Sequence, residues 1–136
     1  MKAVYATGTN YDDPLSVLEV GTMPEPETKP FWSTIRVNSA SVNHHDVWSL
    51  QGVGLSDEQT PMILGTDAAG VLEEDIPVRK GLKAGSEVVL YTFVGTDGAG
   101  VMPGERRSIL SERYAGTMAE YTPVSYTHLR AHETDQ

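Results

Sequence analysis

The chain has 136 residues, enough for one domain of ordinary size and too few for a two-domain enzyme. Its 10 lysines and arginines stand against 19 aspartates and glutamates, and this net charge of -9 argues against a nucleic-acid partner. There is no cysteine, which excludes disulfides, thiolate zinc sites, iron–sulfur clusters and cysteine nucleophiles. We expect a cytoplasmic protein with no membrane partner, because no apolar run reaches the roughly 18 residues of a membrane span and the N-terminus lacks a signal-peptide core.

The first half of the chain predicts three strands and one short helix. Strands are expected at 1–6 and 15–20, which are separated by turn-forming residues. A third is expected at 34–42, where polar residues alternate with apolar or small ones. The segment 45–51 suits a short helix, with Asp46 early enough to favour the positive end of the helix dipole.

The second half predicts further short strands linked by glycine-rich turns. Small residues between Gly65 and Gly70 indicate backbone packed closely against a neighbour, and a strand is expected to follow. Residues 87–91 and 116–121 are expected as strands, and 93–107 as a long surface loop. The glycines of 95–100 match no phosphate-binding motif. Together, these short strands and the one short helix predict a mainly β (α+β) barrel, because the sequence shows no βαβ alternation.

The C-terminal tail does not continue this pattern. Residues 124–134 correspond to the translation, in one frame, of a transposon-based sequencing adapter. We therefore expect residues 1–122 to be one incomplete domain of a longer protein, and residues 123–136 to be an artefact outside the fold. The alternative is a surface helix with a weak metal-binding pair, His128 and His132.

Four motifs follow one another in an order that is typical of one enzyme family. They are 42–48 (VNHHDVW), 61–71 (PMILGTDAAGV), 81–89 (GLKAGSEVV) and 110–121 (LSERYAGTMAEY). Together they resemble the N-terminal, GroES-like catalytic domain of the medium-chain dehydrogenases/reductases, the superfamily of alcohol dehydrogenases and quinone oxidoreductases. The resemblance implies a partly open β-barrel with one or two short helices. It also implies that the superfamily's Rossmann domain is absent from these residues.

The resemblance further implies an enzyme without catalytic zinc. In the zinc alcohol dehydrogenases the first motif begins with a zinc-binding cysteine, and the second carries a zinc-binding histidine followed by an acid. Asn43 and Thr66 stand at those positions, and neither supplies a thiolate or an imidazole. The implied branch is that of the quinone-oxidoreductase-like, zinc-independent enzymes, and no metal-binding residues are expected.

In such enzymes hydride passes from NADPH to a quinone, an activated alkene or a carbonyl. We expect the parent enzyme to be a homodimer acting on a small molecule. We expect this fragment alone to be inactive, poorly soluble and unable to bind NADPH, because most of the cofactor site would lie in the missing Rossmann domain. The alternatives are an alcohol dehydrogenase or enoyl-thioester reductase of the same superfamily, and a non-catalytic GroES-like binding module.

The resemblance assigns catalytic roles to Asn43, His45 and Asp46. Asn43 would donate hydrogen bonds to developing negative charge, His45 would act as an acid, and Asp46 would orient its neighbours. His44 matches a position that touches the cofactor pyrophosphate. The structural alternatives are a helix-start role for Asp46 and, because His44 and His45 are adjacent, side chains that diverge so that at most one lines a cleft.

The substrate pocket is expected to include Trp48, Thr66 and Asp67. Trp48 would form a wall of the pocket. The structural alternatives are a core position for Trp48 and a tight turn satisfied by Thr66 and Asp67.

Overall fold

The computed structural model describes residues 1–27, 29, 30, 32–76, 81–94, 108–125 and 129–131, with only the backbone of the last three. Short antiparallel strands dominate this part of the chain, and α1 (His44–Gln51) is its α-helix. The first strands are β1 (Lys2–Ala6), β2 (Leu18–Thr22), β3 (Trp32–Ser39), β4 (Met62–Ile63) and β5 (Ala69–Leu72). The later ones are β6 (Glu87–Leu90), β7 (Phe93–Val94), β8 (Ser108–Ile109), β9 (Tyr121–Ser125) and β10 (Leu129–Ala131). Single 3-10 turns lie at Pro14–Val17 and Asp57–Gln59.

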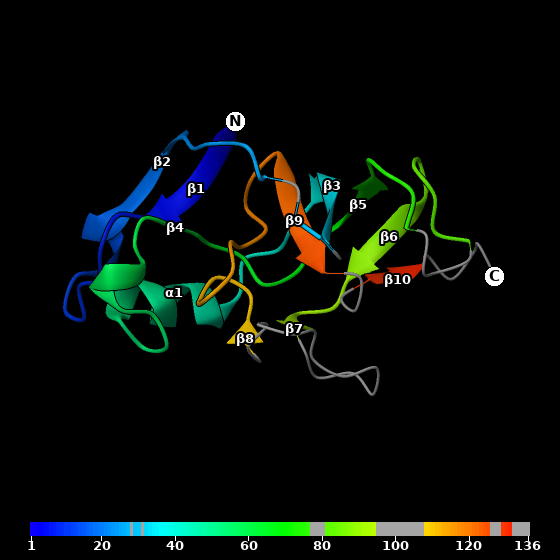
Figure 1. Cartoon of the computed structure of the whole chain (residues 1–136). Coiled ribbons are helices and arrows are strands. Elements are labelled where there is room, and N and C mark those ends of the chain that lie inside the picture. Colours follow the sequence, from blue (N-terminus) through cyan, green and yellow to red (C-terminus); the bar gives the residue numbers. More distant parts are fainter. Residues whose placement is uncertain (28, 31, 77–80, 95–107, 126–128, 132–136) are drawn as a thin grey trace.

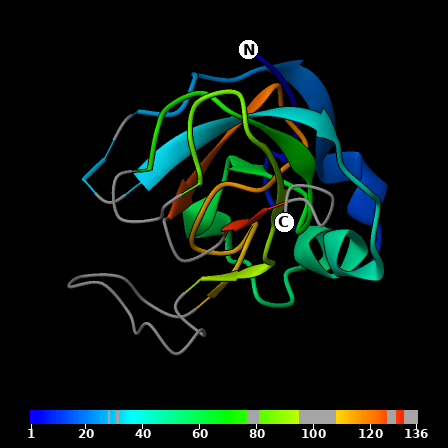
Figure 2. The ribbon, with the colours of Figure 1, turned by 90° about the vertical axis from the view of Figure 1, so that its right-hand side faces the viewer.

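The strands form two main sheets and a small hairpin-like pair. One sheet has the order β2-β1-β4, the other β10-β6-β5-β3-β9, and β7 pairs with β8 (Figure 1). Each of these pairings between the described strands is antiparallel. The view in Figure 2 shows the long β3 curving across the fold, with α1 at one side. The structure confirms the mainly β, partly open architecture with a short helix that the sequence predicts.

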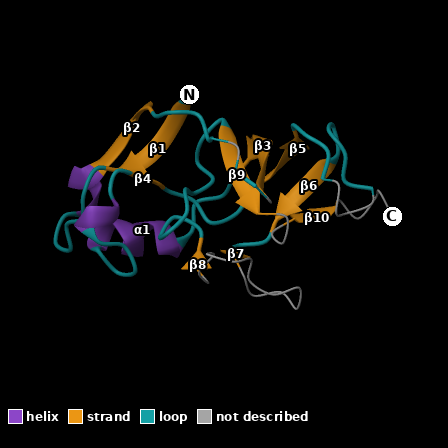
Figure 3. Cartoon of the chain, viewed as in Figure 1, coloured by secondary structure: helices purple, strands orange, loops and turns teal. Residues whose placement is uncertain are grey.

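Two apolar clusters hold these elements together. The larger one lies on the five-stranded sheet, where alternate residues of β3, β5 and β6 point inward, among them Ile35, Leu72 and Val88. The smaller one joins α1 to the three-stranded sheet through Leu50, with Leu64 fully buried beside it. Figure 3 shows α1 next to this smaller sheet. The helix is therefore fixed on one face and leaves its opposite face exposed.

Several predicted elements are confirmed, and others begin or end elsewhere. The strand at 1–6, the helix at 45–51 and the strand at 87–91 agree with β1, α1 and β6 to within one residue. The strand predicted at 15–20 is wrong in its first half, because a 3-10 turn that begins at Pro14 precedes β2. The strand expected at 34–42 is β3, which begins at Trp32 and ends at Ser39.

The predictions for 93–107 and 116–121 need larger corrections. Phe93 and Val94 form β7, which pairs with β8, while residues 95–107 lie outside the described residues. Residues 116–120 form a bent connection rather than a strand, and β9 begins only at Tyr121. The bend follows the backbone of 63–65, since Gly116 N–H donates to Ile63 O and Met118 N–H to Leu64 O. These long-range hydrogen bonds replace a regular sheet ladder.

The close backbone packing expected between Gly65 and Gly70 is confirmed. A β-carbon at Gly70 would collide with the Arg36 carbonyl of β3, and one at Gly65 would meet Thr117 and Met118. Gly65 also has φ +100°, a conformation that favours glycine.

The domain end expected at residue 122 falls inside β9. Residues 123–125 continue the pairing with β3, Val124 is fully buried, and β10 pairs with β6. The structure therefore carries strands past that end, since backbone hydrogen bonding at a sheet edge does not depend on the identity of the side chains. The adapter origin of the tail stays a prediction, and His128 and His132 lie outside the described residues.

No helix within the described ranges is long and apolar enough to cross a bilayer.

Candidate active site

The N-terminus of α1 is built around the carboxylate of Asp46. Asn43 precedes the helix in an extended conformation, and its N–H donates to Asp46 Oδ2 at 2.9 Å. In return, the Asp46 N–H donates to the Asn43 carbonyl at 3.0 Å. This reciprocal arrangement satisfies N–H groups that a helix start leaves without intrahelical partners.

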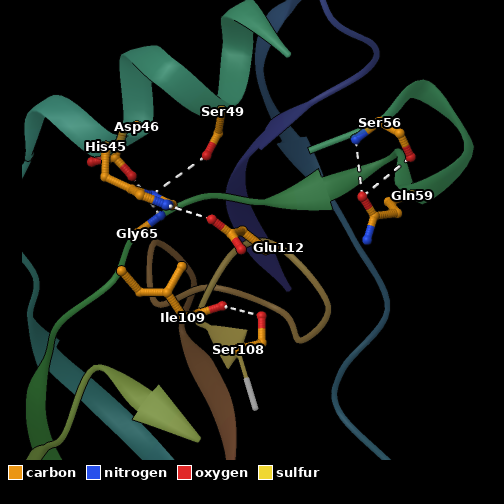
Figure 4. A network of polar contacts seen from close by, with 9 residues as sticks. All are labelled: His45, Asp46, Ser49, Ser56, Gln59, Gly65, Ser108, Ile109 and Glu112. Carbon is orange, nitrogen blue, oxygen red and sulfur yellow. Dashed lines mark hydrogen bonds and ion pairs between the residues drawn. The ribbon is translucent and has the colours of Figure 1, made fainter. Parts of the chain in front are cut away.

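Asp46 also ties the helix to the loop before β5. Its Oδ1 accepts the Gly65 N–H at 2.9 Å, and the residue is only 4% exposed (Figure 4). Both carboxylate oxygens are thus occupied by backbone donors. Asp46 therefore connects the backbone of the helix start with the backbone of this loop.

A polar cluster lies between the end of β3 and the start of β5. Asn43 Nδ2 lies 3.1 Å from Asp67 Oδ2, 3.3 Å from Ser41 Oγ and 3.4 Å from Thr66 Oγ1. Ser41 donates to Asp67 twice, from its N–H at 3.0 Å and from its hydroxyl at 2.7 Å. The structure therefore brings together Asn43, Thr66 and Asp67, three of the residues that the sequence offers as site candidates.

Asp67 is the charged centre of this cluster. Burial by itself raises the pKa of Asp67, but the hydrogen bonds from the Ser41 hydroxyl, the Ser41 N–H and Asn43 outweigh it, so the pKa lies below the ordinary value. The carboxylate is thus ionised at neutral pH. It forms part of the lining of a shallow hollow whose other residues are small or apolar: Ser39, Ala40, Ser41, Ala68, Ala69 and Val89.

The cluster is arranged to donate hydrogen bonds. Three protein acceptors share the two Asn43 amide hydrogens, and the contact to Thr66 is the longest of the three. The Thr66 hydroxyl is itself a second donor, on a side chain that is almost fully buried.

His45 points toward the 110–114 turn. Its Nε2 lies 3.0 Å from Glu112 Oε1, and its Nδ1 lies 3.5 Å from Ser49 Oγ, one helical turn onward (Figure 4). The ring is mostly buried, with 16% of its side chain exposed. Both ring nitrogens have protein partners.

His44 occupies the exposed side of the same helix turn. Its ring meets the edge of Trp48 with centroids 4.9 Å apart. The two histidines diverge, as the structural alternative expected, although the cause is helical rather than extended backbone. Trp48 is 46% exposed, so the alternative of a core position for Trp48 does not hold.

Sequence analysis missed Ser41, Ser49 and Glu112. Ser41 is close enough to Asn43 in sequence to have been noticed, and Ser49 lies four residues after His45 on the same helix face. Glu112 lies in the fourth motif, but no local spacing connects it with His45, 67 residues earlier. Only the folded chain brings these two together.

The donors of this site do not suit a tetrahedral zinc ion. Asn43 and Thr66 offer a neutral amide and a hydroxyl, and Asn43 presents its nitrogen to the Asp67 carboxylate. Across the described residues, no three His, Asp or Glu side chains converge on one point.

Comparison with known proteins gives a consistent family. The family model described as the alcohol dehydrogenase GroES-like domain matches residues 29–133. Dehydrogenase orsE from Emericella nidulans is 30% identical over 117 residues, which cover 79% of this chain and 33% of that protein. The chain thus spans about a third of the length of this curated relative.

Solved structures agree. A crystal structure of an NAD-dependent alcohol dehydrogenase is 33% identical with a TM-score of 0.78, covering all of this chain and 40% of that one. The cobalt- and zinc-bound thermostable alcohol dehydrogenase from Pyrobaculum aerophilum is 26% identical with a TM-score of 0.77, covering 98% of this chain and 41% of the other.

Proposed function

The chain belongs to the family of alcohol dehydrogenase GroES-like domains, and from this premise we propose that it is the substrate-binding part of an NADPH-dependent oxidoreductase. The intact enzyme transfers hydride to a quinone, an activated alkene or a carbonyl without catalytic zinc. The activity is proposed for a longer protein, because this chain covers 33–41% of the relatives described above.

One observation carries the zinc-free assignment. The cluster of Asn43, Thr66 and Asp67 places an amide and a hydroxyl around an ionised carboxylate. Hydrogen-bond donors in a fixed arrangement stabilise negative charge that develops on a substrate oxygen, which is the task that zinc performs as a Lewis acid. The charge of Asp67 holds the Asn43 amide in place, with its nitrogen toward the hydroxyls of Ser41 and Thr66.

The remaining residues take supporting roles. NADPH, when bound, supplies the hydride. His44, exposed on the first turn of α1, would donate to its pyrophosphate, and Trp48 would wall the substrate pocket. His45 would give a proton to the reduced substrate. Asp46 would hold the helix start and Gly65 at a fixed distance through its two hydrogen bonds.

The test uses the intact enzyme recovered from the source DNA. NADPH oxidation is measured with a quinone, an enone and an aldehyde, and we expect turnover with at least one of them. Asn43→Ala should lower kcat by about 10²-fold, the typical effect of losing one oxyanion donor. The matched control is Asn38→Ala, because Asn38 is an exposed asparagine of β3; this variant should keep full activity. Absence of turnover with all three substrates, or full activity of Asn43→Ala, would refute the proposal.

An alcohol dehydrogenase of the same family is the second candidate. It is favoured by the 33% identity to the NAD-dependent alcohol dehydrogenase over the whole of this chain. The same enzyme preparation, given NAD⁺ and a panel of alcohols, separates the two candidates, since the second one predicts NADH formation.

A further inference from the structure

Glu112 reaches α1 from a tight turn that the chain holds in an unusual conformation. Leu110 and Tyr114 bridge across the turn, and the Ser111 N–H donates to the Tyr114 carbonyl at 2.9 Å. Ser111 is fully buried and has φ +67°, in the left-handed region that side chains disfavour. The surrounding structure must therefore hold this turn, and the turn aims Glu112 at the helix.

The Glu112 carboxylate fits beside the helix because residue 54 is a glycine. A β-carbon on Gly54 would come within 2.5 Å of Glu112 Oε1 and 3.0 Å of Cδ. Gly54 lies in the turn that follows α1. The carboxylate therefore lies against the helix at His45 and against the following turn at Gly54. This independent contact restricts where the carboxylate can lie.

The contact between Glu112 and His45 decides which ring nitrogen carries hydrogen. An ionised carboxylate only accepts hydrogen bonds, so at 3.0 Å the Nε2 of His45 must be the donor. In neutral imidazole the other nitrogen is then an acceptor, and Nδ1 faces the Ser49 hydroxyl at the longer distance of 3.5 Å. Nδ1 is thus the less firmly held nitrogen.

We infer that Glu112 is a positioning residue that keeps hydrogen on Nε2 of neutral His45 and leaves Nδ1 as the nitrogen that takes up and releases a proton. The catalytic meaning of this inference rests on the proposed role of His45. A proton bound at Nδ1 makes the imidazolium, and its transfer to the reduced substrate's anion forms the new O–H or C–H bond. His45 returns to the Nε2–H tautomer, and Glu112 stays a carboxylate throughout.

The tautomer is measurable in the intact enzyme, without turnover. In ¹⁵N-labelled protein at about pH 8.5, well above the ordinary histidine value of about 6.5, long-range ¹H–¹⁵N spectra distinguish protonated from bare ring nitrogens. We expect His45 to show a protonated Nε2 and a bare Nδ1. The exposed His44 is the internal reference and should show averaged tautomers. A protonated Nδ1 on His45, or averaging like that of His44, would overturn the inference.

Three variants separate positioning from general support of the fold. Glu112→Ala should shift the His45 nitrogens toward the averaged values of His44, and Gly54→Ala should do the same by displacing the carboxylate. Glu112→Gln, which keeps an acceptor oxygen, should retain the Nε2–H tautomer. Glu73→Gln removes a distant, exposed carboxylate paired with Arg36 and should change nothing at His45. An unchanged His45 spectrum in folded Glu112→Ala and Gly54→Ala would contradict the inference.

Kinetics of the intact enzyme separate this inference from the proposed function. If His45 is the acid, Glu112→Ala should lower kcat about tenfold with KM little changed, and Glu112→Gln should recover most of that loss. If His45→Phe keeps full kcat while the His45 spectrum is as expected, the acid role fails and the positioning of His45 by Glu112 stands.

Discussion

Two aspartates accept hydrogen bonds from Asn43, one from its backbone and one from its side chain, and they hold different kinds of groups. Asp46 is 4% exposed, and its two oxygens accept backbone N–H groups from Asn43 and Gly65. Asp67 is partly exposed and binds the side chains of Ser41 and Asn43, together with one N–H. One carboxylate holds backbone to backbone, whereas the other orients side chains beside a hollow.

The difference shows how to separate scaffold from chemistry among charged residues of one motif. A buried carboxylate that accepts a backbone N–H group on each oxygen holds the backbone together, and its removal should mainly cost stability. A carboxylate that orients exposed or half-buried polar side chains affects what a substrate meets. We therefore expect substitutions at Asp46 and its partners to lower the free energy of unfolding more than substitutions at Asp67.

The largest loss of stability is expected at Gly65, the partner of Asp46. Gly65→Ala combines a φ of +100°, costing about 1–2 kcal/mol, with overpacking against Thr117 and Met118, costing about 1–3 kcal/mol. We therefore expect the free energy of unfolding, measured by urea titration, to fall by about 4 kcal/mol. Gly85→Ala is the matched control, since φ there is +87° but no described atom would lie within 4 Å of the new carbon. Equal losses for both variants would contradict the packing explanation.

Removal of the Asp46 carboxylate should come next. Asp46→Ala leaves the N–H groups of Asn43 and Gly65 without their acceptor, and we expect a loss of about 3 kcal/mol in the free energy of unfolding. Asp46→Asn, which keeps one oxygen, should lose roughly half as much. Loss of less than about 1 kcal/mol in Asp46→Ala would show that these two hydrogen bonds do not hold the helix start.

Asp67 should contribute less, and its contribution should depend on pH. Because its folded pKa is below the ordinary value of 3.8, the stabilisation is present above that value and is lost as the pH falls through the folded pKa. We expect Asp67→Asn to lower the free energy of unfolding by about 1 kcal/mol at neutral pH, and this difference to close as the pH falls below 3.8 and through the folded pKa of Asp67. A gap that persists unchanged in acid would contradict the ionised carboxylate at the centre of the cluster.

The smallest effect is expected at an ion pair remote from both aspartates. Arg36 Nε lies 3.9 Å from Glu73 Oε1, and both side chains are well exposed. Glu73→Gln should therefore change the free energy of unfolding by less than about 0.5 kcal/mol. The same urea titrations measure it. A loss as large as that of Asp67→Asn would mean that surface charge, rather than the polar cluster, accounts for the Asp67 result.

Much of the fold could be predicted because its signals are local. The alternation around Ile35, the helix start at Asn43 and Asp46, and the small residues from Gly65 to Gly70 each act over a few residues. The bend at 116–120 could not be predicted, because its conformation depends on hydrogen bonds to 63–65, about fifty residues away.

The site divides in the same way. Asn43, Thr66 and Asp67 were expected from two motifs, and the structure places them in hydrogen-bonding contact. The partnership of Glu112 with His45 depends on the left-handed Ser111 and the absent side chain of Gly54, neither of which has a sequence pattern pointing to His45. Long-range geometry set by single residues is the part that pattern analysis misses.

Zinc dependence of the intact enzyme tests the proposed chemistry most directly. NADPH oxidation is followed before and after treatment with a strong chelator, and zinc per chain is measured by elemental analysis on the same sample. Hydrogen-bond donors at Asn43 and Thr66 predict substoichiometric zinc and full activity after chelation. Stoichiometric zinc, with activity that the chelator abolishes and added zinc restores, would contradict a site that works without metal.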